Sequence, residues 1–168
     1  MLNCPRALHT LWALWLFFVL PLPGLHAAEA LLPAARPNIV FILADDLGYT
    51  DIAPYGSEVN TPTLSALARQ GVRFTNYHTA ANCAPARAML LTGVNNHLAG
   101  VPNIPEMLAP EQRRYPHYQG VLGDNVVTVA TLLEGVGYHT YMAGKWHLGA
   151  TPEKRPSRRG FERTVALM

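Results

Sequence analysis

The chain has 168 residues, a formal net charge of +2 at pH 7, and charged side chains at 14% of its positions. This length holds one domain at most. The basic cluster at Lys154, Arg155, Arg158 and Arg159 is not interleaved with aromatic residues, which argues against nucleic acid as a partner.

The first 30 residues follow the three-part pattern of a secretory signal peptide. A charge at Arg6 precedes an apolar run over residues 11–20, and a stretch of small residues follows around 27–30. Pro21 ends the run before the about 20 apolar residues that a bilayer requires, so we expect no stable membrane anchor. The prediction is an exported protein, periplasmic or secreted, that loses Cys4 with its leader.

The next segments alternate between strand and helix patterns. Residues 38–44 form a continuous apolar run, as in strands buried on both faces, and the run stops at Asp45 and Asp46. Residues 60–70 predict a helix, with Pro62 in its first turn and Gly71 as its stop signal. Residues 72–78 predict a second strand.

A second helix and a third strand follow further along. Residues 84–92 predict a helix with Cys83 as its cap, because a proline is tolerated only in a first turn. Residues 102–123 are Pro-rich and polar, and they are interpreted as a loop or insertion. Another helix begins at Thr128 and ends at Gly135 or Gly137, and residues 138–143 predict the third strand.

This alternation predicts an α/β fold with a mostly parallel sheet and helices on both faces. In such folds, ligands bind beyond the carboxyl ends of the strands. Polar side chains follow each of the three predicted strands: Asp45 and Asp46, then Cys83, then Lys145 and His147. The sequence therefore predicts that these residues meet at one site.

Cys83 is the single cysteine that remains after removal of the leader, so it has no partner for an internal disulfide. It is either an idle buried thiol or a reactive group, and a helix N-terminus favours the reactive group together with a bound anion. Arg87 lies one helical turn further on, where its guanidinium can reach a group attached at position 83.

Three motifs resemble the sulfatase family. Cys83, Pro85 and Arg87 match its Cys-x-Pro-x-Arg signature, which continues through a small and apolar run to Thr92 and Gly93. Residues 144–149 match a second signature, Gly-Lys-Trp-His-Leu-Gly, without a change, and residues 45–51 match the acidic segment. One departure is Ala86, where family members most often have serine.

The resemblance implies that Cys83 is converted to formylglycine by a maturation enzyme, which would be a partner of this chain. It implies that Lys145 contacts the sulfate and that His147 hydrogen-bonds the formylglycine hydroxyl. Asp45 and Asp46, with modified Cys83, would be ligands of Ca²⁺, with Mg²⁺ as the other hard cation that carboxylates suit. Asp51 is interpreted as an acid that braces its loop.

The implied activity is hydrolysis of sulfate monoesters by an arylsulfatase-like enzyme of the alkaline phosphatase-like superfamily. Residues 36–168 would be the N-terminal portion of its catalytic domain, and the resemblance fades after Phe161. About six to eight oxygens are needed to enclose calcium, more than these residues supply. We therefore expect a truncated domain without turnover of its own.

Other interpretations stay open. The same superfamily includes phosphonate and phosphate monoester hydrolases, and an exported fragment without catalytic function is a third possibility. Trp146 is expected to pack and hold its loop, and His97 to be an ordinary surface histidine. The basic cluster of Lys154, Arg155, Arg158 and Arg159 is interpreted as a solvated loop.

Overall fold

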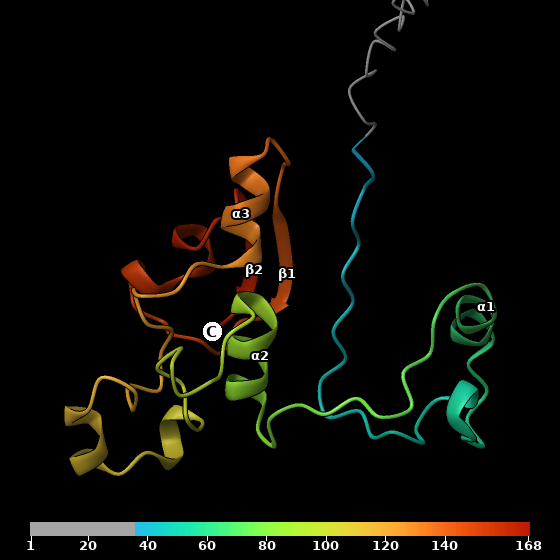
Figure 1. The fold of residues 1–168 in the computed structure, drawn as a ribbon, viewed down its shortest axis with the longest axis horizontal. Helices are drawn as coiled ribbons and strands as arrows, with labels where there is room; N and C mark the ends of the chain where they lie inside the picture. The colour runs from blue at the N-terminus through green and yellow to red at the C-terminus, as the bar shows by residue number, and fades with distance from the viewer. Residues whose placement is uncertain (1–35) are drawn as a thin grey trace, which may run out of the picture. The chain divides into compact units, whose positions relative to one another are not determined.

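The computed structural model describes residues 36–168 (Figure 1). The predicted leader and Cys4 therefore lie outside the described residues. The chain divides into two units, residues 1–42 and residues 43–168. The described part of the first unit, residues 36–42, has no helix or strand.

Helices and strands of the second unit follow one another in this order: η1 (Ala53–Tyr55), α1 (Pro62–Gln70), α2 (Cys83–Thr92), η2 (Pro105–Met107), η3 (Pro110–Arg114), α3 (Val129–Gly135), β1 (Tyr141–Lys145), η4 (Pro152–Lys154), η5 (Pro156–Arg158) and β2 (Arg163–Leu167). The η elements are short 3₁₀ helices.

The helices form where local sequence signals predict them. α1 has Pro62 in its first turn, and the N–H of Gly71 donates to the helix end. α3 is capped by Thr128, whose hydroxyl accepts from the N–H of Thr131 at 3.2 Å. α2 begins one residue earlier than predicted, because Asn82 is its N-cap and Cys83 is its first residue.

β1 and β2 pair in parallel, from Tyr141 opposite Arg163 to Lys145 opposite Leu167 (Figure 1). The chain between them makes the long crossover that a parallel pair requires. The α/β class is therefore confirmed. β1 begins three residues later than the predicted third strand and continues to Lys145, and β2 was not predicted.

The other two predicted strands, residues 38–44 and 72–78, are wrong. Both segments lack strand structure, and β1 and β2 make up the whole sheet among residues 36–168. Their apolar side chains are exposed, with Val40 at 83% and Val72 at 82%. An apolar run reveals that a segment suits a sheet, but a strand forms only where a neighbour supplies its hydrogen bonds.

A small core lies beneath the residues that carry the motifs. Ala84 and Ala88 of α2 pack there with Leu122, Trp146 and Leu148, and all five are fully buried. The indole N–H of Trp146 donates to the carbonyl of Lys154 at 2.9 Å. Trp146 therefore holds its loop, as predicted, and ties the segment after β1 to α2.

The basic cluster at residues 154–159 is not simply a solvated loop, so that interpretation is wrong for two members. Arg159 is 8% exposed and donates to the carbonyl of Leu122 at 3.0 Å and to Asp124 at 2.8 Å. Lys154 donates to the same carboxylate oxygen at 2.7 Å. A long cation becomes buried when its head finds fixed acceptors.

Residues 36–168 contain no helix with the length and apolar character needed to cross a membrane.

The turn before β2 depends on Gly160, whose φ of +84° lies in the left-handed region. A Cβ at this position would overlap the backbone of Thr131 at the start of α3. We expect Gly160→Ala to lower the free energy of unfolding by about 3 kcal/mol, from strain and overpacking together. Urea titration followed by circular dichroism measures this change.

Gly135 is the matched control, because a Cβ there meets no atom within 4 Å and the residue lies in α3. Gly135→Ala should raise the free energy of unfolding by about 0.5–1 kcal/mol. Equal stability of the Gly160→Ala variant and the wild type would contradict the account of this turn.

The ion pairs of Asp124 predict a stability that depends on pH. Lys154, and then Arg159, hold the pKa of Asp124 below its ordinary value. A carboxylate with a lowered folded-state pKa stabilises the fold fully above its unfolded pKa of about 3.9, and the stabilisation is lost as the pH falls through the folded-state value. Wild type should therefore exceed Asp124→Asn in unfolding free energy near neutral pH, and the two should converge in acid.

Urea titrations at a series of pH values measure this difference. Glu58→Gln serves as the control, since Glu58 makes no ion pair among residues 36–168, and its difference from wild type should stay near zero throughout. A difference between wild type and Asp124→Asn that does not change with pH would exclude this role of the ion pairs.

Candidate active site

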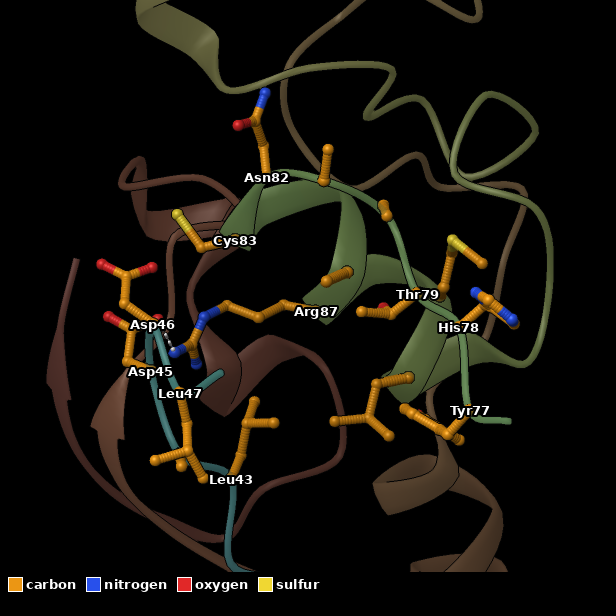
Figure 2. A pocket seen from close by; sticks show the side chains of 16 residues that line it. Leu43, Asp45, Asp46, Leu47, Tyr77, His78, Thr79, Asn82, Cys83 and Arg87 are labelled. Atoms are coloured by element: carbon orange, nitrogen blue, oxygen red, sulfur yellow. Dashed lines mark hydrogen bonds and ion pairs between the residues drawn. The ribbon is translucent and has the colours of Figure 1, made fainter. Parts of the chain in front are cut away.

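The structure brings the predicted site residues together from three distant segments. Asp45 and Asp46 lie in a bend near the start of the second unit, and α2 supplies Cys83 and Arg87. Lys145 is the last residue of β1, and His147 follows two residues later. Figure 2 shows Asp45, Asp46, Cys83 and Arg87 gathered at one end of a pocket.

Asp45 links two of these segments through its carboxylate. One oxygen accepts from Nη2 of Arg87 at 3.0 Å, the contact dashed in Figure 2, and the other accepts from Nζ of Lys145 at 2.9 Å. The Asp45 side chain is 41% exposed, whereas that of Arg87 is 9% exposed. Asp45 thus neutralises two cations, the almost buried Arg87 and the more exposed Lys145.

These contacts shift two pKa values in opposite directions. The hydrogen bond from Lys145, followed by that from Arg87, lowers the pKa of Asp45. The same Asp45 contact, followed by the contact with Cys83, raises the pKa of Lys145. Both residues are therefore charged near neutral pH.

The sulfur of Cys83 lies between two nitrogen atoms. Nδ1 of His147 is 3.2 Å from Sγ, and Nζ of Lys145 is 3.3 Å from it. Cys83 is partly buried at the first turn of α2, where backbone N–H groups lack helical partners. The atom attached to the β-carbon at position 83 therefore has a base on one side and a cation on the other.

Arg87 contacts the neighbours of Cys83. Its Nη1 donates to the backbone carbonyl of Lys145 at 2.6 Å, and its Nη2 donates to Asp45. Its Nε is buried without a partner in the described part of the chain. Arg87 was predicted to reach a group attached at position 83. In the structure its hydrogen bonds instead go to Asp45 and to the carbonyl of Lys145.

The pocket beside these residues has a volume of about 550 Å³. Asp46 and Cys83 line it together with apolar residues such as Leu47 and Leu90. Asp46 makes no hydrogen bond to any residue in the range 36–168, so its carboxylate is available to a ligand.

Two site residues have left-handed backbone conformations that only glycine adopts freely. Asp46 has a φ of +56° and His147 a φ of +58°. Such residues are uncommon and gather at functional sites, where the surrounding contacts hold them. Each of them follows a residue that other contacts hold in place. Asp46 follows Asp45, and His147 follows Trp146.

The predicted cation ligands fit a hard cation in chemistry but not in number. Asp45 and Asp46 supply carboxylate oxygens, which Ca²⁺ and Mg²⁺ prefer. No group of three or more histidine, cysteine, aspartate or glutamate side chains suited to hold a metal occurs within residues 36–168. Two carboxylates leave most of the about six to eight positions around calcium unfilled.

Two residues beside the catalytic motifs agree with their predictions. Asp51 braces its loop as predicted, since its carboxylate accepts from the N–H of Gly48 at 2.6 Å. His97 is an exposed surface residue, as predicted, and its ring packs against Tyr118, with centroids 5.6 Å apart.

Sequence reasoning missed Glu106 of η2, whose carboxylate is 3.7 Å from Nε2 of His147. It also missed Asn103, which accepts from Nδ2 of Asn82 at 2.6 Å. Both belong to the segment that was interpreted as an insertion, and no spacing in the sequence links them to the site.

Comparisons with known proteins agree with the motifs. The sulfatase family model matches residues 37–167. An arylsulfatase from Klebsiella aerogenes is 44% identical over 86% of this chain, and arylsulfatase A from Homo sapiens is 44% identical over 85%. The match extends through β2, so the predicted end of the resemblance after Phe161 is wrong.

The crystal structure of Ps i-CgsB is 34% identical, with a TM-score of 0.67 over 79% of this chain and 28% of that one. The similarity shows the alkaline phosphatase-like sulfatase fold. The chain covers 30% of the Klebsiella relative and 27% of the human one, less than a third of either. Since the family model matches more than half of the chain and the motif residues converge, this chain belongs to the sulfatase family.

Proposed function

We propose that this chain supplies part of the active site of an enzyme that hydrolyses sulfate monoesters, as its arylsulfatase relatives are named to do. The observation that carries the proposal is the position of Cys83 Sγ, within 3.3 Å of both Lys145 and His147. A buried structural thiol would not need a cation and a base beside it.

The nucleophile in this proposal is a formylglycine hydrate at position 83. One hydroxyl of such a group would attack sulfur while the substrate alcohol leaves, and loss of the proton from the second hydroxyl would then re-form the aldehyde and release sulfate by C–O cleavage. A hydrate at position 83 would lie at a helix start beside His147 and Lys145, which can hydrogen-bond its hydroxyls. Pro85 and Arg87 of the family signature are both present.

Lys145 and the first turn of α2 would bind the sulfate oxygens. Nζ of Lys145 is 3.3 Å from the reacting position, close enough to donate to an oxygen of a sulfate held there. The unpaired N–H groups at the start of α2 add a partial positive charge. Arg87 would act through its hydrogen bonds to Asp45 and to the carbonyl of Lys145, which keep the lysine in place.

His147 would handle the proton at position 83. Its Nδ1 is 3.2 Å from Sγ, within reach of a hydroxyl attached to the same carbon. An imidazole there can hydrogen-bond one hydroxyl and accept its proton as sulfate departs.

Within the catalytic motifs, Asp45 and Asp46 balance Arg87 and Lys145, so the formal charges of these four residues sum to zero. A neutral set attracts a sulfate ester weakly. A divalent cation on the two carboxylates, Ca²⁺ with Mg²⁺ as the alternative, would make the site positive and polarise the group bound at position 83. Further oxygen ligands would have to join these two aspartates.

The first test is the mass of the peptide that contains residue 83. After coexpression with a formylglycine-generating enzyme, we expect the peptide to lose about 18 Da, the change from thiol to aldehyde. The Cys83→Ala variant is the control and should keep its calculated mass. An unmodified Cys83 under conditions that convert an arylsulfatase control would contradict the proposed nucleophile.

The second test is stabilisation by calcium, which a non-catalytic fragment would not show. At a calcium concentration 100 times the dissociation constant, binding should add about 2.7 kcal/mol to the free energy of unfolding. Asp46→Asn should reduce this gain strongly, because it removes a proposed ligand.

Asp51→Asn is the matched control, since it removes the same charge from a residue that braces the neighbouring loop. It should keep the calcium-dependent gain even where it lowers the starting stability. Thermal or urea unfolding with and without calcium measures both variants. No calcium effect on the wild type would favour a fragment without catalytic function.

A further inference from the structure

The segment from Asn103 to Glu106 forms a wall of the candidate site. Oδ1 of Asn103 accepts from Nδ2 of Asn82, the residue before Cys83, at 2.6 Å. Three residues later, the carboxylate of Glu106 is 3.7 Å from Nε2 of His147. One short stretch therefore touches the neighbour of the proposed nucleophile and the proposed base.

This wall is braced by its own loop. Nη2 of Arg113 donates to the carbonyl of Pro105 at 2.6 Å, and Nη1 donates to that of Gln119 at 3.2 Å. The N–H groups of Gln119 and Gly120 in turn donate to the carbonyl of Gly100, at 3.0 and 2.9 Å. The backbone that carries Glu106 is thus fixed from both sides.

The imidazole of His147 lies between two different partners. Nδ1 is 3.2 Å from Sγ of Cys83, and Nε2 faces the carboxylate of Glu106. An ionised carboxylate only accepts hydrogen bonds, and a neutral imidazole has one N–H and one bare nitrogen. A carboxylate beside Nε2 therefore favours the tautomer with its proton on Nε2 and its lone pair on Nδ1.

We propose that Glu106 is a positioning residue for His147, which holds the proton on Nε2 and leaves the Nδ1 lone pair directed at the group on position 83. The catalytic value of this arrangement rests on the proposed function, where Nδ1 serves the hydroxyl at that position. The Glu106 side chain is 68% exposed, so it can rotate to shorten the 3.7 Å separation, and solvent weakens the pair.

The tautomer of His147 tests the proposal without turnover. Long-range ¹H–¹⁵N correlation on chain labelled at histidine nitrogen reports which ring nitrogen has the proton. It is recorded at about pH 8, where an ordinary imidazole is neutral. A His147→Gln variant identifies the signals. In the wild type we expect the Nε2–H tautomer, and a proton on Nδ1 with a bare Nε2 would overturn the proposal.

Glu106→Leu removes the acceptor and keeps the bulk, so the ratio of the Nε2–H to the Nδ1–H tautomer should fall by about fivefold. Glu106→Gln keeps an acceptor oxygen and should preserve most of the preference. An unchanged ratio in Glu106→Leu would overturn the positioning role.

Glu111→Leu is the matched control, because Glu111 lies in the adjacent η3 and its carboxylate has no partner in residues 36–168. It should leave the ratio as in the wild type, and a shift as large as that of Glu106→Leu would contradict a specific contact. Absence of formylglycine at position 83 would defeat the proposed function but leave this tautomer result standing, so the two failures are distinguishable.

Discussion

The carboxylate of Asp45 is the contact on which the site depends. It accepts from Arg87, 42 positions away in sequence, and from Lys145, 100 positions away, and so joins α2 to the end of β1. Without it, the guanidinium of Arg87, 9% exposed, would face the ammonium of Lys145 with no anion between them. Like charges repel, so loss of this carboxylate would weaken the placement of Lys145 beside Cys83.

The sequence predicted the helices well and the strands poorly, for one physical reason. Helix signals are local: Thr128 caps α3, and Gly71 ends the hydrogen bonding of α1. A strand depends on a partner that can lie anywhere in the chain. β1 extends to Lys145 because Leu167 pairs with it, and nothing in residues 138–145 could reveal that.

The candidate site shows the same division. Cys83, Arg87, Lys145 and His147 belong to compact motifs, so their spacing drew attention to them. Glu106 at the site, like Arg159 outside it, carries no such spacing, because each contacts a residue that only the fold brings near. Glu106 faces His147 from across 41 positions of sequence, and Arg159 reaches Asp124 from 35 positions away. From sequence alone, a polar residue in a Pro-rich stretch is interpreted as solvent-exposed, because the partner that the fold supplies is not visible.

The backbone of the site explains how His147 can serve Cys83 while its neighbour is in the core. Trp146 is fully buried and held by the carbonyl of Lys154, so its position is set by packing. The φ of +58° at the next residue turns the chain sharply and returns the imidazole toward Cys83. This conformation costs on the order of 1 kcal/mol for a residue with a β-carbon. Two sets of contacts offset that cost: the packing of the buried indole, and the contacts of the imidazole with Cys83 and Glu106. The geometry of the site therefore depends on the stability of the core.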